Sequence, residues 1–392
     1  MTAPFKADAE ALIREKADHL FSAKAFPKNG QPFGLDVKRC NVSMDESWTP
    51  HARSSITCAL PDADQLALLD ARIGCRVQIT TGYRYGKDDE ESYLLVDLHL
   101  RSREIDHGAG VVTLDLESDE SLLIDHILYG TESVDRSDLF GFVSSVLELT
   151  GPEFSSKIYS FFGEGEFAKE LAGETIGKSG GVFVGTPNEA KSELEPVLGG
   201  TAWSLIEEAQ RRTGTWVYCQ NGRDWVISER AEITATPLLS LTVGEEGTIL
   251  VGKSVLSRNN FYNEVIFRYE WRDETRLPAD RWVLGSARIT GGPFSVNSIA
   301  RQTYVETIDR RASQTEADIA ARDKLSRLLT KGYEFTVRAV AAYWLRAGDT
   351  VSLTLDGKTE KVLVKTINFE PDAGTMSLVL RKPEHATLST EF

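Results

Sequence analysis

The chain has 392 residues, of which 41% are hydrophobic and 26% are charged, and its formal net charge is −15. A chain of this length forms about two to four domains, and we expect three. No stretch approaches the about 20 apolar residues that cross a bilayer, which argues against membrane insertion, and the acidic balance argues against a surface that holds the phosphate backbone of nucleic acid.

An amphipathic helix is predicted over residues 4–25. Its apolar side chains recur every three or four residues and therefore share one helical face; they are Ala9, Leu12, Ile13, Ala17, Leu20 and Phe21. Pro27, Asn29-Gly30 and Pro32 end the helix, so we expect an N-terminal helical arm over residues 1–33. Packing on the chain's own core is the favoured interpretation of the stripe. The alternative is a partner-docking helix that uses Leu12, Ile13, Leu20 and Phe21.

From residue 34 to about residue 118 the sequence is typical of β-strands bounded by turn residues. The predicted strands are Leu35–Val42, Ser54–Ala59, Arg76–Tyr83, Tyr93–Ile105 and Val111–Leu116. The acidic segment from Gly86 to Ser92 lies between two of them. We interpret it as a solvated hairpin tip, because a cation site needs fixed geometry.

Residues 119–237 are predicted to form an α/β domain. Helices are expected over residues 119–129, 137–149 and 202–212, and a hairpin over residues 215–228 turns at Asn221-Gly222. In the glycine-rich stretch 163–200, Gly177-Lys178-Ser179 is the nearest approach to a phosphate-binding loop, and a plain surface loop is the favoured interpretation. Trp203, Trp216 and Trp225 could form a sugar-stacking platform, but core packing is the favoured interpretation.

Residues 238–392 return to strands. Residues 263–271 alternate strictly between apolar and polar side chains, and a helix is predicted over residues 315–330, ended by Gly332. The last strands, Thr350–Leu355, Lys361–Phe369 and Thr375–Leu380, are separated by Asp356-Gly357 and Asp372-Ala373-Gly374. This pattern predicts an antiparallel meander with tight hairpins, which is typical of a scaffold rather than a catalyst.

Signatures of chemistry are missing from the sequence. The six histidines are scattered, and Gly-x-Gly-x-x-Gly does not occur; Gly-x-Ser-x-Gly occurs at residues 177–181, within the stretch that is predicted to be a surface loop. Cys40, Cys58, Cys75 and Cys219 occur singly, so we predict free buried thiols. The first ten residues do not form a secretory signal, which favours folding in a cytoplasm. We therefore predict a protein that is not an enzyme and has no cofactor and no metal site.

Several stretches resemble the minor tail proteins of actinobacteriophages that form the tail hub. They are Ser47–Cys58, Arg76–Tyr85, Asp97–Arg103 with Val112–Glu120, Ala202–Tyr218, Tyr262–Val265 with Arg268–Trp271, and Leu345–Val351. More distantly, the order of strand block, α/β insertion and strand block is similar to the hub fold of contractile-tail baseplates and type VI secretion spikes. The resemblance implies a mainly β, α+β fold with two β-barrel domains, over residues 34–118 and 238–392, flanking the insertion domain at residues 119–237.

The resemblance also implies a role. In that family, two similar barrels per subunit let a trimer present six barrels to a hexameric tail tube. This chain would then be a virion protein at the tail tip, with an acidic channel through which DNA passes without specific binding. The implied partners are two further copies, a distal tail or tail tube protein, a tape measure protein and other tail-tip or fibre proteins. A carbohydrate-binding module and a cell-wall hydrolase are the alternatives.

Overall fold

The computed structural model describes most of the chain. The described residues are 5–6, 9–15, 17–87, 89–135, 138–151, 158–160, 196, 198–213, 215–220, 223–228, 233–244, 247–256, 261–272, 280–309, 311–328, 333–382 and 388–389. Most of the glycine-rich stretch 163–200, the turn at Asn221-Gly222 and Gly332 lie outside them. No helix of the described part is long and apolar enough to cross a membrane.

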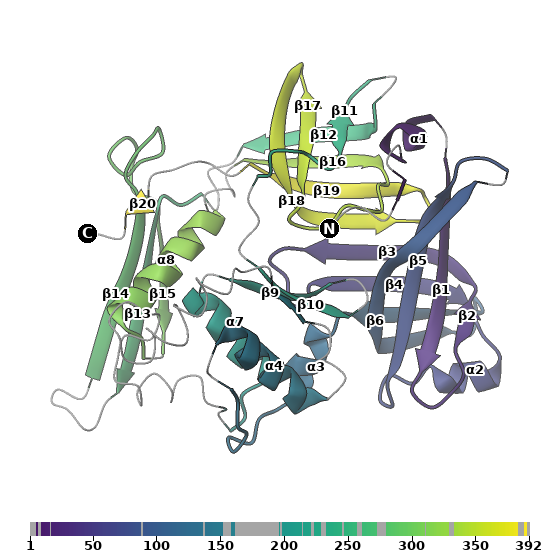
Figure 1. Ribbon diagram of the computed structural model, residues 1–392, viewed down its shortest axis with the longest axis horizontal. Helices are drawn as coiled ribbons and strands as arrows, with labels where there is room; N and C mark the ends of the chain where they lie inside the picture. The colour runs from purple at the N-terminus through teal and green to yellow at the C-terminus, as the bar shows by residue number, and fades with distance from the viewer. Residues whose placement is uncertain are drawn as a thin grey trace.

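The first strand block forms one half of a 13-stranded sheet (Figure 1). Its strands are β1 (Asp18–Pro27), β2 (Phe33–Leu35), β3 (Val37–Asp45), β4 (Ala52–Ala59), β5 (Cys75–Arg84), β6 (Glu90–Asp106) and β7 (Val111–Glu117), with helix α2 (Ala63–Leu68) between β4 and β5. The five strands predicted in this region are all present. Their alternating apolar residues, such as Val77 and Ile79, are fully buried, because successive side chains of a strand point to opposite faces.

The predicted N-terminal helical arm is wrong over half its length. Helix α1 (Ala9–Glu15) ends before Leu20 and Phe21, which lie on strand β1 and pair with β5. The spacing of three and four residues was fortuitous: the side chains of Ala23 and Ala25 alternate into the core opposite Ile79 and Val77. A long-range pairing therefore overrides the local helical period.

The second strand block completes the same sheet. Its strands are β11 (Ser240–Thr242), β12 (Ile249–Leu256), β16 (Tyr333–Val340), β17 (Thr350–Leu355), β18 (Lys358–Glu370) and β19 (Thr375–Arg381). The predicted C-terminal meander is confirmed, and Asp356 and Gly357 both have the positive φ of a tight hairpin turn. Strand β3 pairs with β18 and joins the two blocks. The described strands of the two blocks therefore form one open sheet, and the two β-barrels that were predicted are not present among the described residues.

Two smaller units pack beside the large sheet (Figure 1). The α/β unit contains α3 (Glu120–Asp125), α4 (Leu139–Thr150), β8 (Ile158–Ser160), α7 (Ala202–Thr213), β9 (Trp216–Gln220) and β10 (Asp224–Ser228). The other is a four-stranded sheet of β13 (Glu264–Arg272), β14 (Asp280–Ile289), β15 (Thr303–Ile308) and β20 (Leu388–Ser389), covered by α8 (Gln314–Leu328). Each unit has a hydrophobic core of its own. The helices predicted over residues 119–129, 137–149, 202–212 and 315–330 are confirmed as α3, α4, α7 and α8.

The two strand blocks have the same strand order. The first block is ordered β3-β4-β7-β6-β5-β1, and the second is ordered β12-β16-β19-β18-β17-β11. The neighbouring pairs among the first five strands of each order are antiparallel in both blocks. Only the sixth strand differs, because β1 is antiparallel to β5 whereas β11 is parallel to β17. The chain thus contains one β unit twice.

The repeat extends to residue register and to the β-bulges. In hairpin β6–β7 the ladder skips Arg101, and in hairpin β18–β19 it skips Lys365. Every pairing of the first hairpin maps onto one of the second when 264 is added to both residue numbers, as for His99↔Glu117 and Leu363↔Arg381. Both hairpins turn through four residues that end in a glycine, Gly110 with φ 65° and Gly374 with φ 63°, a conformation that favours glycine.

Candidate functional site

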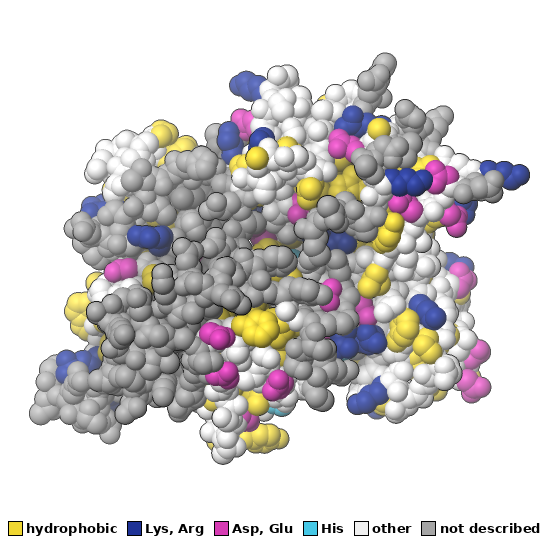
Figure 2. Space-filling model, viewed as in Figure 1, with side chains coloured by type: hydrophobic (Ala, Val, Ile, Leu, Met, Phe, Trp, Pro, Cys, Tyr) yellow, Lys and Arg dark blue, Asp and Glu magenta, His cyan; other side chains and the backbone are white. Residues whose placement is uncertain are grey.

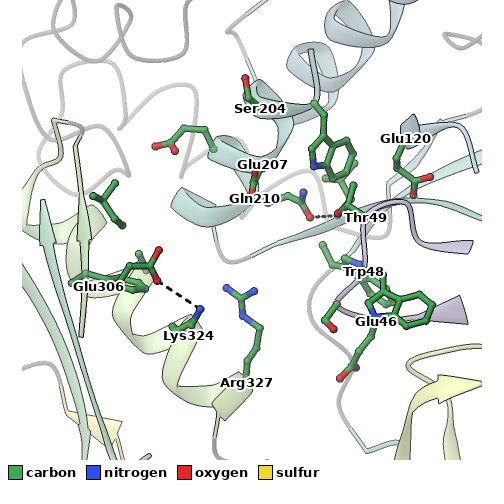
Figure 3. A pocket seen from close by; sticks show the side chains of 18 of the residues that line it. Glu46, Trp48, Thr49, Glu120, Ser204, Glu207, Gln210, Glu306, Lys324 and Arg327 are labelled. Carbon is green, nitrogen blue, oxygen red and sulfur yellow. Dashed lines mark hydrogen bonds and ion pairs between the residues drawn. The ribbon is translucent and has the colours of Figure 1, made fainter. Parts of the chain in front are cut away.

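A cavity of about 500 Å³ lies where the first strand block, the α/β unit and the four-stranded sheet meet (Figure 3). The turn after β3, helix α7 with strand β9, and strand β15 with helix α8 each supply part of its wall. Six carboxylates line it, namely Glu46, Glu120, Glu207, Glu208, Glu306 and Asp309, beside the cations of Lys324 and Arg327. The cavity is therefore an acidic junction between three packed units.

Ion pairs in the wall use several of these carboxylates. Glu46 accepts hydrogen bonds from the Arg381 guanidinium at 2.5 and 2.9 Å, which ties the turn after β3 to β19. Glu306 lies 3.8 Å from the Lys324 ammonium and accepts a hydrogen bond from the Tyr304 hydroxyl at 2.8 Å. These pairs hold the wall together across different elements. Figure 2 shows further acidic side chains gathered around a small apolar patch over α4 and α7.

Two buried acids lie where the α/β unit meets the first block, and Asp119 links the two. Asp119 lies 2.8 Å from Nε2 of His99 on β6 and accepts a hydrogen bond from Nε of Arg223 at 2.9 Å. Glu120, which is 1% exposed, accepts a hydrogen bond from the backbone N–H of Cys219 at 2.8 Å. Burial raises the pKa of Glu120 to about 7, because a carboxylate loses its hydration there.

A second polar cluster anchors the hairpin β9–β10 to the second block. The buried Arg346 guanidinium donates to the carbonyl oxygens of Tyr343 and Leu345 at 2.7 Å, and burial lowers its pKa to about 10. The Asp349 carboxyl accepts the Arg346 backbone N–H at 2.7 Å, and burial raises the pKa of that carboxyl to about 6. Arg346 and Asp349 also act electrostatically on Tyr218 of β9. The cluster therefore has a structural role.

The polar lining of the cavity consists of carboxylates, hydroxyls, one amide and two cations. It contains neither histidine nor cysteine. Across the described ranges, no group of three or more His, Cys, Asp or Glu side chains is arranged to hold a metal ion. His51, next to this region, is fully buried, and burial lowers its pKa to about 4. The cavity lies where three packed units of the chain meet.

The candidate docking residues are placed on two different elements. Ile13 of α1 is 4% exposed and belongs to the main core, while Leu20 and Phe21 are partly buried on β1. The side chain of Leu12 lies outside the described part. The polar side of α1 contacts the second block, since Glu10 accepts the backbone N–H of Ser240 at 3.1 Å. Docking of this segment on a partner stays a prediction.

The three tryptophans of the predicted α/β domain and the four cysteines are buried. Trp203, Trp216 and Trp225 are at most 8% exposed, and Trp216 stacks on Tyr218 with ring centroids 4.0 Å apart, which confirms the core interpretation. The four cysteines are free and buried, as predicted. In the acidic tip, Asp89 pairs with Lys6 and Glu90 with Arg84.

The sequence analysis missed the internal repeat. It therefore did not predict that β6 is equivalent to β18 and that β12 is equivalent to β3. The signal was present: Asp106-His-Gly-Ala-Gly110 and Glu370-Pro-Asp-Ala-Gly374 occupy the same position in two strand pairs of equal register. A comparison of the chain with itself would have found this Ala-Gly turn twice. The repeated side chains are otherwise different, so alternation alone predicted strands and not their equivalence.

Comparison with known proteins shows the fold. The chain is similar to the tail protein from Neisseria meningitidis MC58, with a TM-score of 0.62 and 12% identity over 92% of this chain and 96% of that chain. It is similar to the 43 kDa tail protein of prophage MuSo2 from Shewanella oneidensis, with a TM-score of 0.57 and 11% identity over 92% and 98%. A chain of the Francisella PdpA-VgrG complex gives a TM-score of 0.51 and 9% identity over 96% of this chain and 62% of that chain.

No family model and no curated protein sequence matches the chain. The fold is therefore that of phage tail proteins, and at 9 to 12% identity the likeness extends to the fold alone.

Proposed function

We propose that the chain is a structural virion protein that forms a trimeric hub at the tip of a phage tail. The observation that carries the proposal is the internal repeat. Two β units with the same strand order and register stand in one polypeptide, so three chains in a closed ring carry six similar units. Such a ring matches a hexameric tail tube on one face and a threefold tip on the other.

The fold supports the same reading over nearly the whole chain. The tail proteins from Neisseria and Shewanella are covered over 96% and 98% of their lengths, so both strand blocks and the units between them have counterparts there. In the proposed hub, a distal tail or tail tube protein and the tape measure protein contact the sixfold face. Other tail-tip or fibre proteins contact the threefold face.

The charge of the chain suits a conduit for DNA. With a formal net charge of −15 per chain, a bore lined mainly by carboxylates repels phosphates and leaves DNA free to slide, whereas lysines and arginines would hold it. We propose a net negative bore for this reason. The carbohydrate-binding alternative needs open aromatic faces; of its four tryptophans, Trp203, Trp216 and Trp225 are buried and Trp271 is partly buried.

The proposal is tested on the purified chain and on its mixture with the cognate tail tube protein. Light scattering after size exclusion, followed by electron microscopy, should give three-chain rings, alone or on the tube. A one- or two-chain species at the end of the tube contradicts the hub. A ring whose bore is lined mainly by lysine and arginine contradicts the conduit.

A further inference from the structure

The junction between the two blocks of one chain is an edge-to-edge strand pairing. Strand β18 pairs with β17 through residues 358–363 and, beyond its bulge at Lys365, with β3 through residues 366–369. The pairs are Thr366↔Asp45, Ile367↔Met44, Asn368↔Ser43 and Phe369↔Val42. Side chains lock this register, because the Ser43 hydroxyl donates to Asn368 Oδ1 at 2.9 Å and the Thr366 hydroxyl donates to Asp45. Strand β3, at the edge of the first block, thus pairs with the part of β18 that β17 does not reach.

The repeat places the same two half-surfaces at two other positions in the sheet, on β6 and on β12. Strand β6 corresponds to β18; it pairs with β5 only as far as His99, and its residues 102–105 have no described strand on that side. Strand β12 corresponds to β3 and is the last strand of the sheet, with no described neighbour beyond it. One half-surface is the part of β6 beyond His99, where the Arg103 guanidinium donates to the carbonyl oxygen of Leu66 in α2. The other is the open edge of β12, which has the register to pair with it.

We propose that β12 of one chain pairs antiparallel with β6 of a second copy of this chain, in the register that β3 and β18 use within the chain. The correspondence adds 212 from β3 to β12, since Val37↔Cys58 and Ile249↔Ala339 start equivalent ladders, and 264 from β6 to β18. The pairs between copies are then Ser254↔Ile105, Val255↔Glu104 and Leu256↔Arg103. This inference rests on the proposed trimer and specifies which surfaces close it.

Exposure of the equivalent residues supports an unoccupied interface. Within the chain, Cys40 and Val42 of β3 are at most 3% exposed. Their equivalents on β12, Gly252 and Ser254, are exposed, and so are the apolar Val251 and Val255 beside them. Residues 102–104 of β6 are exposed as well. A flat apolar edge strand left open is a site of aggregation, so covering it with a second copy removes that hazard.

Charge is complementary across the same pairing. The exposed Lys253 on β12 takes the position of Asn41 on β3, one residue beyond the Val42↔Phe369 pair, and therefore falls opposite Asp106 of the second copy. Glu104 stands beside it on β6. A cation on one edge and two carboxylates on the other favour this partner and this register, because opposite charges directly across a ladder stabilise it.

Disulfide trapping tests the register directly. The double variant Glu104→Cys/Val255→Cys places one thiol on each edge at positions equivalent to the touching pair Asn368 and Ser43. A matched positive control is Ser43→Cys/Asn368→Cys, which should form the disulfide within one chain. A matched negative control is Glu104→Cys/Val251→Cys, which is four residues and about 13 Å out of register. The native cysteines are buried and give little background.

Oxidation should give reducible two- and three-chain species on denaturing gels from Glu104→Cys/Val255→Cys, at least about tenfold more than from the negative control. Three-chain particles by light scattering that fail to cross-link, although the positive control forms, overturn the strand pairing and leave the trimeric hub standing. A reducible ladder beyond three chains supports the pairing and refutes the closed hub. A chain that stays monomeric and uncrosslinked, both alone and on the tail tube, overturns both.

A charge reversal gives a second measurement that does not depend on oxidation. Lys253→Glu sets three carboxylates against one another and should weaken association by about fivefold per interface at low salt. Reversing the neighbouring charge as well, in Lys253→Glu/Glu104→Lys, should restore part of the association, because Asp106 still faces the new carboxylate. Both side chains are exposed, so the fold of the single chain is retained. Equal association of all three proteins contradicts the pairing.

Discussion

Replacing Tyr83 by phenylalanine should separate the stability of the joint between the two strand blocks from the stability of the rest of the protein. Tyr83 lies on β5 and is fully buried. Its hydroxyl donates to the carbonyl oxygen of Ala341 at 2.6 Å and accepts the backbone N–H of Tyr343 at 3.0 Å. Both partners follow β16 in the second block, so one hydroxyl satisfies two buried backbone groups across the joint.

The magnitude follows from these two bonds. The phenyl ring keeps the packing against the rings of Tyr343 and Phe5, whose centroids lie 5.1 and 5.4 Å away. Each backbone group left without a partner in the core costs about 1 to 3 kcal/mol. We therefore expect Tyr83→Phe to lower the free energy of unfolding by about 2 to 6 kcal/mol in total.

Urea unfolding followed by tryptophan fluorescence measures this change, with an unchanged dependence of the free energy on urea concentration. Tyr85→Phe is the matched control, because the Tyr85 hydroxyl donates to the Glu91 side chain at a partly buried site; its loss should stay below about 1 kcal/mol. A loss below about 0.5 kcal/mol for Tyr83→Phe would refute the reasoning that this hydroxyl joins the blocks.

Three further predictions concern the packing at Gly285, the buried acid Glu120 and the buried cysteines. Gly285→Ala should lower the free energy of unfolding by more than about 2 kcal/mol, because the new Cβ would lie 2.1 Å from the carbonyl oxygen of Ala317 in α8. The control Gly34→Ala, which has open space around the new Cβ, should change it by less than about 0.5 kcal/mol. Equal losses in the two variants would contradict this packing. The pKa of Glu120 rises on folding from 4.5 to about 7, so the folded protein holds a proton that the unfolded chain releases, and stability falls as pH rises through that window. Glu120→Gln should remove this pH dependence. Between pH 5 and pH 8, the free energy of unfolding of the variant should therefore rise relative to that of the native protein by up to about 3 kcal/mol, as measured by urea unfolding. Equal pH dependence in the two proteins would contradict the assignment. Because burial raises the pKa of Cys40 and Cys58 to about 12 and of Cys75 to about 11, a thiol reagent at pH 8 should find no reactive cysteine in the native protein and four after unfolding; rapid labelling of the native protein speaks against the buried sites.

Most strands and helices could be predicted from the sequence because their signals are local. The alternation in β13 and the turn at Asp356-Gly357 specify a strand and a hairpin from their own residues. Strand β1 was misread because its partner β5 begins about 50 residues later, and only that pairing shows which of its side chains face the core. Local periodicity carries no information about such a partner.

The joint and the cavity could not be predicted for the same reason. The pairing of β3 with β18 connects residues more than 300 positions apart, and the cavity wall combines the turn after β3 with α7 and α8. The equivalence of the two blocks lies in their register and bulges, while their side chains differ, as Arg53↔Glu117 in one ladder and Glu334↔Arg381 in the other show. Backbone pairing, and not residue identity, carries the repeat.

A cryo-electron microscopy map of the assembled ring, alone or on its tail tube, tests the central claim most directly. The account predicts three chains that present six similar β units around one opening, with β12 of each chain seated on β6 of the next as β3 is seated on β18. A ring in which the two blocks occupy dissimilar positions, or an assembly without a common opening, would contradict it.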